Sequence, residues 1–551
     1  VLRSTRLMTA SLGKLSSSQF INGDVTVERY IPSDAIIPGH HAKSWQHLAV
    51  PVNGQTLKQS WQEGASTPNA NPFPGYGTQI TGAILNATTP GIGFDVHTPV
   101  GGASVKSYNS ANNTWTFISN TTNTPSYNQK GYMAFVRGDR SVISFSGANS
   151  QAKSTVLRSK GRLFTPSGTL PLKTTIAPNK LESIGNPYAS AIEFTQIVYD
   201  GPPSILNKFW IWDPTLNTST NFGGWQLLSP TATGDFTPVP GGTVNYPAGV
   251  VSSRIQSGQA FFMMGGTSGG TVEFTEVAKV SGSANTVRQP LPLVNRQSLA
   301  INMFNANQQL SDGVMVVWDR NFTNEIDAED AIKLMNPTEN LGIHTFEKHL
   351  TLESRSAFQN RDSIQLSIKG LKNQTYSFRI APKNFSSSHS FELYLVDRFT
   401  GMHHSLSYTS ENEFVFAVSS SQVLSANEFR FYIIAIKKKA KKPVYTSDPE
   451  TKGNGLITKN ALDDKLESTI SISPNPVRKG KLMFTVKNSE AGNHEIVVKD
   501  LMGNRLYSSH FESVDNSFQH SVQLTETLPT GVYILVIQNK NKIQKATFVV
   551  E

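Results

Sequence analysis

The chain has 551 residues, more than the roughly 250–300 at which a single hydrophobic core stops growing, so several domains are expected. It has no cysteine, which excludes disulfides, thiolate metal sites and a cysteine nucleophile. The net charge is +9, but five lysines lie together at 437–443. We interpret that tract as a solvated linker and expect no nucleic-acid partner, because it lacks the interleaved aromatic residues of a single-strand binder.

The N-terminus reads VLRSTRLMTASLG, without an initiator methionine or an apolar signal region. We therefore expect either that a signal was removed or that the chain is a fragment. No run of eighteen apolar residues occurs, so the sequence predicts no membrane-spanning helix. Gly (41) and Pro (29) are frequent and charged residues make up only 16% of the chain, which favours short strands joined by turns.

Helical periodicity is nearly absent, and the fold class predicted is all-β, with several β-sandwich domains in tandem. Two short stretches are the best helix candidates: 57–63, and 328–336, where Pro337 would end the helix. Almost everything else is a short apolar run between Gly, Pro, Asn and Ser, as in YMAFVRG and QAFFMMGG.

The first two predicted domains are β-rich and cover 1–165 and 166–285. Each contains a strand that runs into a proline turn (Pro51, Pro187) and later a glycine followed by an aromatic strand, a Gly-rich turn and another strand. This similarity suggests that the second domain is a loose repeat of the first, although similar turn chemistry in two all-β domains would give the same pattern.

The pattern of predicted strands changes after residue 285. Residues 286–436 contain longer alternating strands, such as SLAINMFN and FRFYIIAI, and predict one antiparallel β-sandwich. Residues 437–465 are polar, carry Pro and Gly and do not alternate, so they are expected to form an exposed, Lys-rich linker.

The last module, 466–551, holds seven segments with period-two alternation and predicts a small seven-stranded β-sandwich. DLMGNRL at 500–506 is typical of a hairpin turn. Proline cannot donate a ladder hydrogen bond, so SPNP at 473–476 is expected at a sheet edge or between two sheets.

Four motifs follow one another along this module: SPNP, then DLMG, then LPTGVY, then a last strand with a lysine. Together they resemble the type A C-terminal sorting domain that marks cargo of the type IX secretion system of Bacteroidota. The residues that carry the resemblance are Pro474, Asn475, Pro476, Asp500, Gly503, Gly531, Val532, Tyr533 and Lys545. For each of them, holding the fold is the alternative to contacting a partner.

The resemblance implies export through the periplasm and outer membrane to the cell surface. It implies three kinds of partner: the outer-membrane translocon with its shuttle β-barrel, a surface sortase-like protease, and anionic lipopolysaccharide. The body of the chain is more loosely similar to the β-rich C-terminal regions of large surface adhesins of the same bacteria, through RYIPSDAI, GNPYAS, SGQAFFM and DAEDAIKLMN. We therefore expect an adhesin-like or structural cell-surface protein.

A search for chemistry gives little, and we expect no enzyme and no required cofactor. No HExxH, GxSxG, Walker or Rossmann pattern occurs. Asp327, Glu329 and Asp330 form a weak calcium candidate, although they equally suit a helix N-terminus. The RGD at 137–139 is better explained as a hairpin turn than as an adhesion motif.

The alternative function is a secreted carbohydrate-binding protein or hydrolase with the same sorting domain. It would need exposed aromatic side chains that stack on sugars, and the candidates are Trp115, Trp210, Trp212 and Trp225. If these tryptophans are buried, they belong to the core instead.

Overall fold

The computed structural model divides the chain into two compact units, an N-terminal unit, Val1–Lys442, and a C-terminal unit, Pro443–Glu551. It describes residues 1–34, 42–82, 92–96, 102–143, 152–166, 172–216, 223–230, 236–241, 253–280, 296–356, 361–385, 391–437, 469–472, 477, 481–487, 492–500, 504–513, 518–524, 528–529, 531–539 and 543–550. Within these ranges the protein is all-β, as predicted, and its helices are short 3-10 turns at Phe194–Gln196, Glu276–Ala278 and Val423–Ala426. No helix in the described part is long and apolar enough to cross a membrane.

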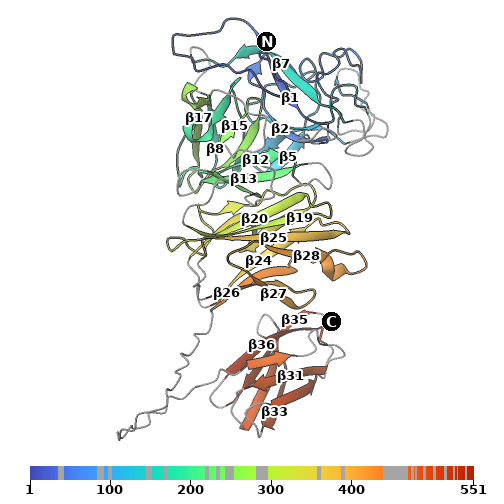
Figure 1. Ribbon diagram of the computed structural model, residues 1–551, viewed down its shortest axis with the longest axis vertical. Helices are drawn as coiled ribbons and strands as arrows, with labels where there is room; N and C mark the ends of the chain where they lie inside the picture. Colours follow the sequence, from blue (N-terminus) through green and yellow to red (C-terminus); the bar gives the residue numbers. More distant parts are fainter. Residues whose placement is uncertain are drawn as a thin grey trace, which may run out of the picture. The chain divides into compact units, whose positions relative to one another are not determined.

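The N-terminal unit begins with two sheets, which we call the first sheet pair (Figure 1). One sheet has the strand order β1 (Val25–Ile31), β7 (Thr155–Leu163), β3 (Val52–Asn53). The other has the order β2 (Ser44–Leu48), β6 (Tyr132–Val136), β4 (Val105–Asn109), β5 (Thr114–Phe117).

The next sheets form the second sheet pair. One has the order β8 (Leu172–Ile176), β17 (Gly270–Phe274), β11 (Val198–Tyr199). The other has the order β9 (Leu181–Gly185), β16 (Ala260–Met264), β12 (Phe209–Asp213), β13 (Gly224–Pro230), β14 (Phe236–Val239). A third, small sheet has the order β15 (Arg254–Ile255), β10 (Ala191–Glu193), β18 (Lys279–Val280). Its strands alternate in sequence with those of the second sheet pair.

The two sheet pairs share one connection pattern. In each, the opening strand (β2 or β9) pairs with the closing strand (β6 or β16), which in turn pairs with a strand of the hairpin between them. In each, the preceding and following strands pair with one another in the companion sheet, as β1 with β7 and β8 with β17. The second pair has one strand more, because β14 covers the outer edge of β13.

Reciprocal backbone bonds join the two sheet pairs. The Ala49 N–H donates to the Gly258 carbonyl over 3.1 Å, and the Gly185 N–H donates to the Gln129 carbonyl over 2.8 Å. Ala49 directly follows β2 and Gly185 is the last residue of β9, and they lie at matching positions, two residues before Pro51 and Pro187. The backbones approach so closely that a Cβ added to Gly185 would lie 2.9 Å from the Ala49 Cβ. An approximate two-fold relation between the pairs follows from this exchange.

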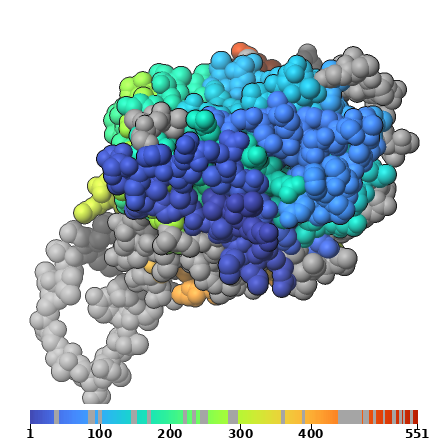
Figure 2. All heavy atoms as spheres, turned by 90° about the horizontal axis from the view of Figure 1, so that it is seen from above, coloured from blue at the N-terminus to red at the C-terminus, as the bar shows by residue number. Residues whose placement is uncertain are grey.

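The N-terminal residues run across both sheet pairs. The Leu2 N–H donates to Thr26, and the Leu12 N–H donates to the Ala189 carbonyl over 2.8 Å. The Leu15 N–H donates to the Glu276 carboxylate over 2.7 Å. Figure 2 shows this segment in dark blue beside later residues of the same unit. It therefore ties β1 to two loops of the second sheet pair.

The rest of the N-terminal unit is one large sheet of eleven strands. Its order is β27 (Met402–Leu406), β26 (Phe391–Asp397), β29 (Phe431–Lys437), β24 (Arg361–Lys369), β22 (Asn340–Thr345), β23 (Lys348–Arg355), β20 (Leu310–Trp318), β19 (Gln297–Phe304), β25 (Thr375–Lys383), β28 (Asn412–Ala417), with β21 (Ala331–Ile332) on β23. Phe416 on β28 and Phe431 on β29 have ring centroids only 4.7 Å apart, although their strands are far apart in this order. The sheet therefore folds over its own core, and it departs from a purely antiparallel sandwich because β20 and β23 are parallel.

Neither predicted helix forms. Residues 57–63 make a run of turns with irregular bonds, such as Gly64 N–H to the Lys58 carbonyl, and bury Leu57 and Trp61. In 328–336, Ile332 belongs to β21, which pairs with β23. Each segment buries some of its residues against other parts of the chain, as Trp61 and Ala331 show, and that packing overrides weak local periodicity.

The C-terminal unit is a small sandwich of seven strands, as predicted. One sheet is β30 (Thr469–Ile472), β31 (Lys481–Lys487), β34 (Phe518–Gln523), and the other is β33 (Arg505–Ser513), β32 (Gly492–Lys499), β35 (Gly531–Gln538), β36 (Ile543–Val550). Its core is made by its own residues, among them Val477, Phe484, Leu535 and Phe548. The finer domain boundaries expected within the chain stay predictions.

Candidate functional site

The Pro-Asn-Pro motif lies between two residues that the structure describes on different sheets. Pro474, Asn475 and Pro476 themselves lie outside the described residues. Before them, Ile472 ends β30, the edge strand of one sheet; after them, the Val477 N–H donates to the Val549 carbonyl over 2.7 Å at the edge of the other. Val477 is fully buried. The chain thus passes from one sheet to the other between Ile472 and Val477. Proline has no N–H to donate to a strand ladder, so it destabilises a sheet least at such a crossing.

Asp500 holds the hairpin between β32 and β33. Its Oδ1 accepts the Asn504 N–H over 2.8 Å, and its Oδ2 accepts the Asn504 side-chain amide, also over 2.8 Å. The Asp500 N–H donates to the Asn504 carbonyl over 3.1 Å. Gly503 lies outside the described residues. The carboxylate is therefore used within its own turn, and Asn504 is a functional partner that the motif pattern did not single out.

Tyr533 belongs to the core of the C-terminal unit. Its hydroxyl donates to the Pro529 carbonyl over 2.7 Å, and its ring centroid lies 5.8 Å from that of Phe548. Gly531 and Val532 are on the same strand, opposite Val550 and Val549 of β36. A Cβ on Gly531 would meet the Tyr533 ring at an ordinary contact distance of 3.6 Å. This part of the motif packs the end of β35 against β36.

The side chain of Lys545, a predicted motif residue, is exposed. It lies on β36 opposite Val536. β36 is an edge strand, so its backbone and the Lys545 ammonium both lie where a partner can reach them. Among the motif residues that the structure describes, Lys545 is the best candidate for direct recognition, and Tyr533 and Asp500 fix the shape behind it.

The acidic cluster at 327–330 is held by the protein's own donors. Asp330 accepts the Ser354 N–H over 2.7 Å and the Asp327 N–H over 2.9 Å. Asp327 in turn accepts the Glu329 N–H over 2.8 Å. These carboxylates cap turns, and burial raises the pKa of Asp330 to about 6.

A lysine supplies positive charge to the same turn. The buried Lys208 ammonium donates to the carbonyl oxygens of Ala328 and Asp330, and burial lowers its pKa to about 8. In the part of the chain that the structure describes, no group of three or more His, Asp or Glu side chains is placed to hold a metal ion. The geometry therefore gives the calcium prediction no support.

The tryptophans considered for sugar stacking lie at an internal junction. Trp210, Trp212 and Trp225 are buried, and Trp115 is partly buried. They pack in one cluster with Tyr108 and Phe262 and with Ala300, Met315 and Val317 of the large sheet. This aromatic cluster joins both sheet pairs to the large sheet, so it is core rather than a flat binding platform.

The RGD tripeptide is buried. Arg137 and Asp139 expose less than a tenth of their surface, and the Asp139 Oδ2 accepts the Gly75 N–H over 2.8 Å. The next residue, Arg140, forms a fully buried two-bond pair with Asp95. Burial opposes the charge on Asp95, but the Arg140 guanidinium outweighs it and lowers the pKa of Asp95. These residues hold the first sheet pair together.

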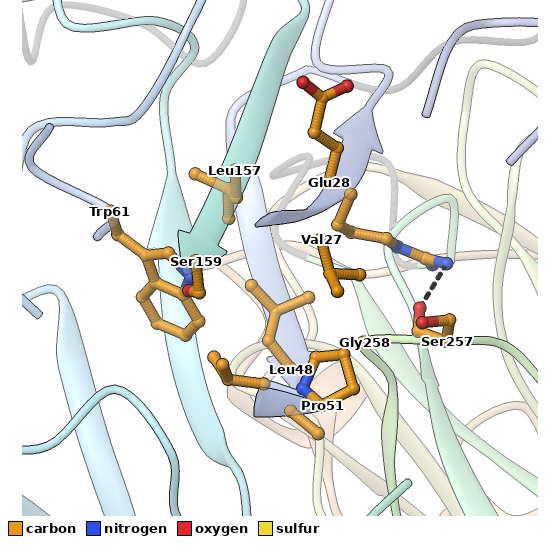
Figure 3. Close-up of a pocket in the computed structure, with 12 residues that line it drawn as sticks. Val27, Glu28, Leu48, Pro51, Trp61, Leu157, Ser159, Ser257 and Gly258 are labelled. Atoms are coloured by element: carbon orange, nitrogen blue, oxygen red, sulfur yellow. Dashed lines mark hydrogen bonds between the residues drawn. The ribbon is translucent and has the colours of Figure 1, made fainter. Parts of the chain in front are cut away.

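A small pocket lies between the two sheet pairs (Figure 3). Val27, Leu48 and Trp61 line its apolar part. Arg29 spans it to the second pair, donating to the Ser257 carbonyl over 3.0 Å, and burial lowers the pKa of Arg29 to about 10. Sequence reasoning missed this arginine, because a lone Arg on an alternating strand gives no signal.

A family described as a domain of unknown function, DUF8693, matches residues 97–433. This protein belongs to the DUF8693 family. A second family, described as the secretion system C-terminal sorting domain, matches residues 471–551, the seven-stranded sandwich. This DUF8693 protein is thus type IX secretion cargo, and the sorting domain directs it across the outer membrane to the cell surface or beyond.

Two further comparisons add little about the passenger. A solved structure titled "Biofilm associated protein - BSP domain" aligns over 81% of this chain and 87% of its own, with 10% identity and a TM-score of 0.11. No curated protein matches the DUF8693 chain.

Proposed function

We propose that this protein is an adhesin-like or structural β-scaffold of the cell surface, and that the export machinery grips it by its C-terminal unit. The observation that carries the proposal is the separation of the two units. The sorting sequence folds around its own core and shares no strand with the N-terminal unit among the described residues. Because the sorting domain folds independently, a receptor can bind it whatever passenger is attached.

The proposed receptor is the outer-membrane shuttle β-barrel of the translocon. A specific interface buries roughly 1,200–2,000 Å² in total, more than a linear motif of a few residues offers. Since Tyr533 is buried and Asp500 is used in its own turn, recognition is assigned to exposed edges of the sandwich, with Lys545 on β36 as one contact. A surface sortase-like protease and anionic lipopolysaccharide are the further partners proposed.

We infer a binding or structural role, without catalysis, for the N-terminal unit. Its most deeply buried ionic groups form pairs that link strands and loops, such as Arg140 with Asp95 and Lys333 with Asp312. Arg430 likewise makes two bonds to Asp397 and also reaches the carbonyls of Ala417 and Ser425. Ion pairs used in this way hold strands and loops in place.

Truncation tests the address. A chain that ends before Thr469 should fold but stay in the periplasm, whereas the full chain reaches the surface. Cell fractionation and protease treatment of intact cells distinguish the two. The passenger's fold is checked by near-UV circular dichroism of the purified truncated protein. Surface arrival of the truncated chain would refute the proposal.

A pull-down tests the receptor. The C-terminal unit, used as bait against solubilised outer membranes, should recover a β-barrel protein, and a Lys545→Glu bait should recover less. If the folded bait captures no barrel protein, the assignment of the shuttle as partner fails.

A further inference from the structure

Strand β5 presents an open sheet edge. It pairs with β4 alone, and no hydrogen bond of the described residues reaches its other side. The Ile118 N–H donates inward to the Val105 carbonyl over 3.3 Å. Because inward and outward groups alternate along an antiparallel strand, the N–H and C=O groups of Trp115 and Phe117 point outward.

In the second sheet pair, the corresponding edge is paired with a further strand. β13 corresponds to β5 by its place in the sheet, and GWQL at 224–227 aligns with TWTF at 114–117. In β13, however, the outer edge is covered by β14, with Leu227 opposite Val239. Leu227 is 0% exposed, whereas Phe117, at the corresponding position, is 46% exposed. Among the described residues, the first sheet pair therefore has no strand in the place that β14 takes in its counterpart.

The open edge has none of the usual protection. Exposed edge strands are normally guarded by charged residues or proline against pairing with another chain. β5 itself has the uncharged sequence Thr-Trp-Thr-Phe, and the nearby charge comes from the neighbouring strand, where Lys106 pairs opposite Phe117 and places its ammonium 5.4 Å from the centre of the Trp115 ring. Thr114 and Thr116 are exposed on one face, and the exposed Phe117 lies on the other face, which it shares with Trp115 of the aromatic cluster.

We propose that β5 pairs antiparallel with β5 of a second copy of this chain. An antiparallel edge is complementary to itself about a two-fold axis, so the same patch serves both subunits. Neither copy of β5 carries a charged side chain, so no like charges stand directly opposite one another between the two paired strands. With Thr116 opposite Thr116 of the second copy, Phe117 lies beside Trp115 of that copy, and the added strand covers Phe117 as β14 covers Leu227 in the second sheet pair.

The pairing is expected to be weak. Two four-residue strands bury less than the roughly 1,200 Å² of a small stable interface, so the dimer should dissociate on dilution. At the cell surface, where copies are concentrated side by side, such contacts would gather the scaffold into pairs. This consequence rests on the proposed surface role, but the pairing itself does not.

Sedimentation velocity of the full chain tests the pairing. The wild type should change from monomer to dimer as its concentration rises. Phe117→Lys places a charge on the edge and should remain monomeric at every concentration. The control is Val198→Lys, which makes the same change at an exposed apolar residue of another edge strand, β11, and should dimerise like the wild type. A monomeric wild type, or a Phe117→Lys dimer, would overturn the proposal.

The absence of cysteine allows a second test. Directly opposite residues in a non-hydrogen-bonded pair lie about 4.5 Å apart at Cα, within reach of a disulfide. Thr116→Cys should therefore form a disulfide-linked dimer on mild oxidation, and Val198→Cys should not. Equal cross-linking of the two variants would show random collision and would refute a specific β5 contact.

Discussion

The imidazole of His47 lies 2.8 Å from the hydroxyl of Ser183, at the boundary between the two sheet pairs. Both residues are buried, and they precede Pro51 and Pro187 by the same four positions. Because the Ser183 hydroxyl donates to the Lys130 carbonyl, it accepts the Nε2–H of His47. The bond thus joins equivalent positions of the two pairs, and it requires an imidazole that sits among the rings of Trp115, Trp225 and Phe262.

His47 makes the N-terminal unit sensitive to acid. Burial lowers the pKa of His47 to about 3, below the value near 6.5 of an unfolded chain. The unfolded state therefore binds the proton first, and the contribution of His47 to stability falls as pH drops from about 6.5 towards 3. Burial raises the pKa of Asp330 to about 6 and that of Glu353 to about 7, so these two carboxyls act in the opposite direction. At pH 5 the His47 contribution should be about 2 kcal/mol smaller than at pH 7.

Urea unfolding followed by tryptophan fluorescence at pH 7 and pH 5 measures this loss. His47→Gln keeps a hydrogen-bond donor and cannot titrate, so its free energy of unfolding at pH 5, taken relative to that at pH 7, should be about 2 kcal/mol higher than in the wild type. His510→Gln is the control, because His510 is exposed on β33 of the other unit. An unchanged pH dependence in His47→Gln would contradict the prediction.

The sequence predicted the strands better than it predicted what they pack against. The seven strands of the C-terminal unit follow from period-two alternation broken by Gly, Pro and Asn, which is local information. The burial of Trp210 and Trp225 depends on sheets formed by residues distant in sequence, so alternation alone left both the core and the sugar-binding interpretation open. The helix expected at 328–336 does not form because Ile332 pairs with Leu350 of β23, which is also information that lies outside the local sequence.

The recognition motif was predictable as a set of residues but not as a set of roles. The side chains of Asp500 and Tyr533 form hydrogen bonds with Asn504 and Pro529, whereas the side chain of Lys545 is exposed. A motif shows which residues occur together, and only packing shows which of them a partner can touch. Val477, which secures the crossing between sheets, carried no signal beyond following Pro476.

Asp500→Ala should destabilise the C-terminal unit. It removes two side-chain hydrogen bonds to Asn504 in a partly exposed turn, at a cost of about 1–2 kcal/mol. Chemical denaturation of the isolated unit, followed by circular dichroism, measures this cost. Glu512→Ala, at an exposed position on the neighbouring strand β33, should change stability by less than about 0.5 kcal/mol. Equal stability of the two variants would show that the clamp contributes nothing.

The buried pair of Arg140 and Asp95 should be costly to break. Asp95→Asn keeps the shape but leaves the Arg140 guanidinium without its counter-charge in a fully buried site. Removing one partner of such a pair costs about 3–5 kcal/mol. The urea midpoint of the N-terminal unit should fall accordingly, while Asp319→Asn, in the partly exposed pair with Arg296, should cost less than about 1 kcal/mol. Similar losses in both variants would contradict this ranking.

Tyr533 and Lys545 should separate folding from recognition. Tyr533→Phe loses the bond to the Pro529 carbonyl and should cost the C-terminal unit about 1 kcal/mol. Lys545→Ala removes an exposed side chain and should change stability by less than about 0.5 kcal/mol, yet it should lower surface export if the ammonium contacts the receptor. Thr547→Ala, exposed on the same face of β36, is the matched control for both readouts. Because export is scored alongside the unfolding midpoint, a Lys545→Ala protein that is stable and exported normally would leave Lys545 without a role in recognition, and a destabilised one would assign it to the fold.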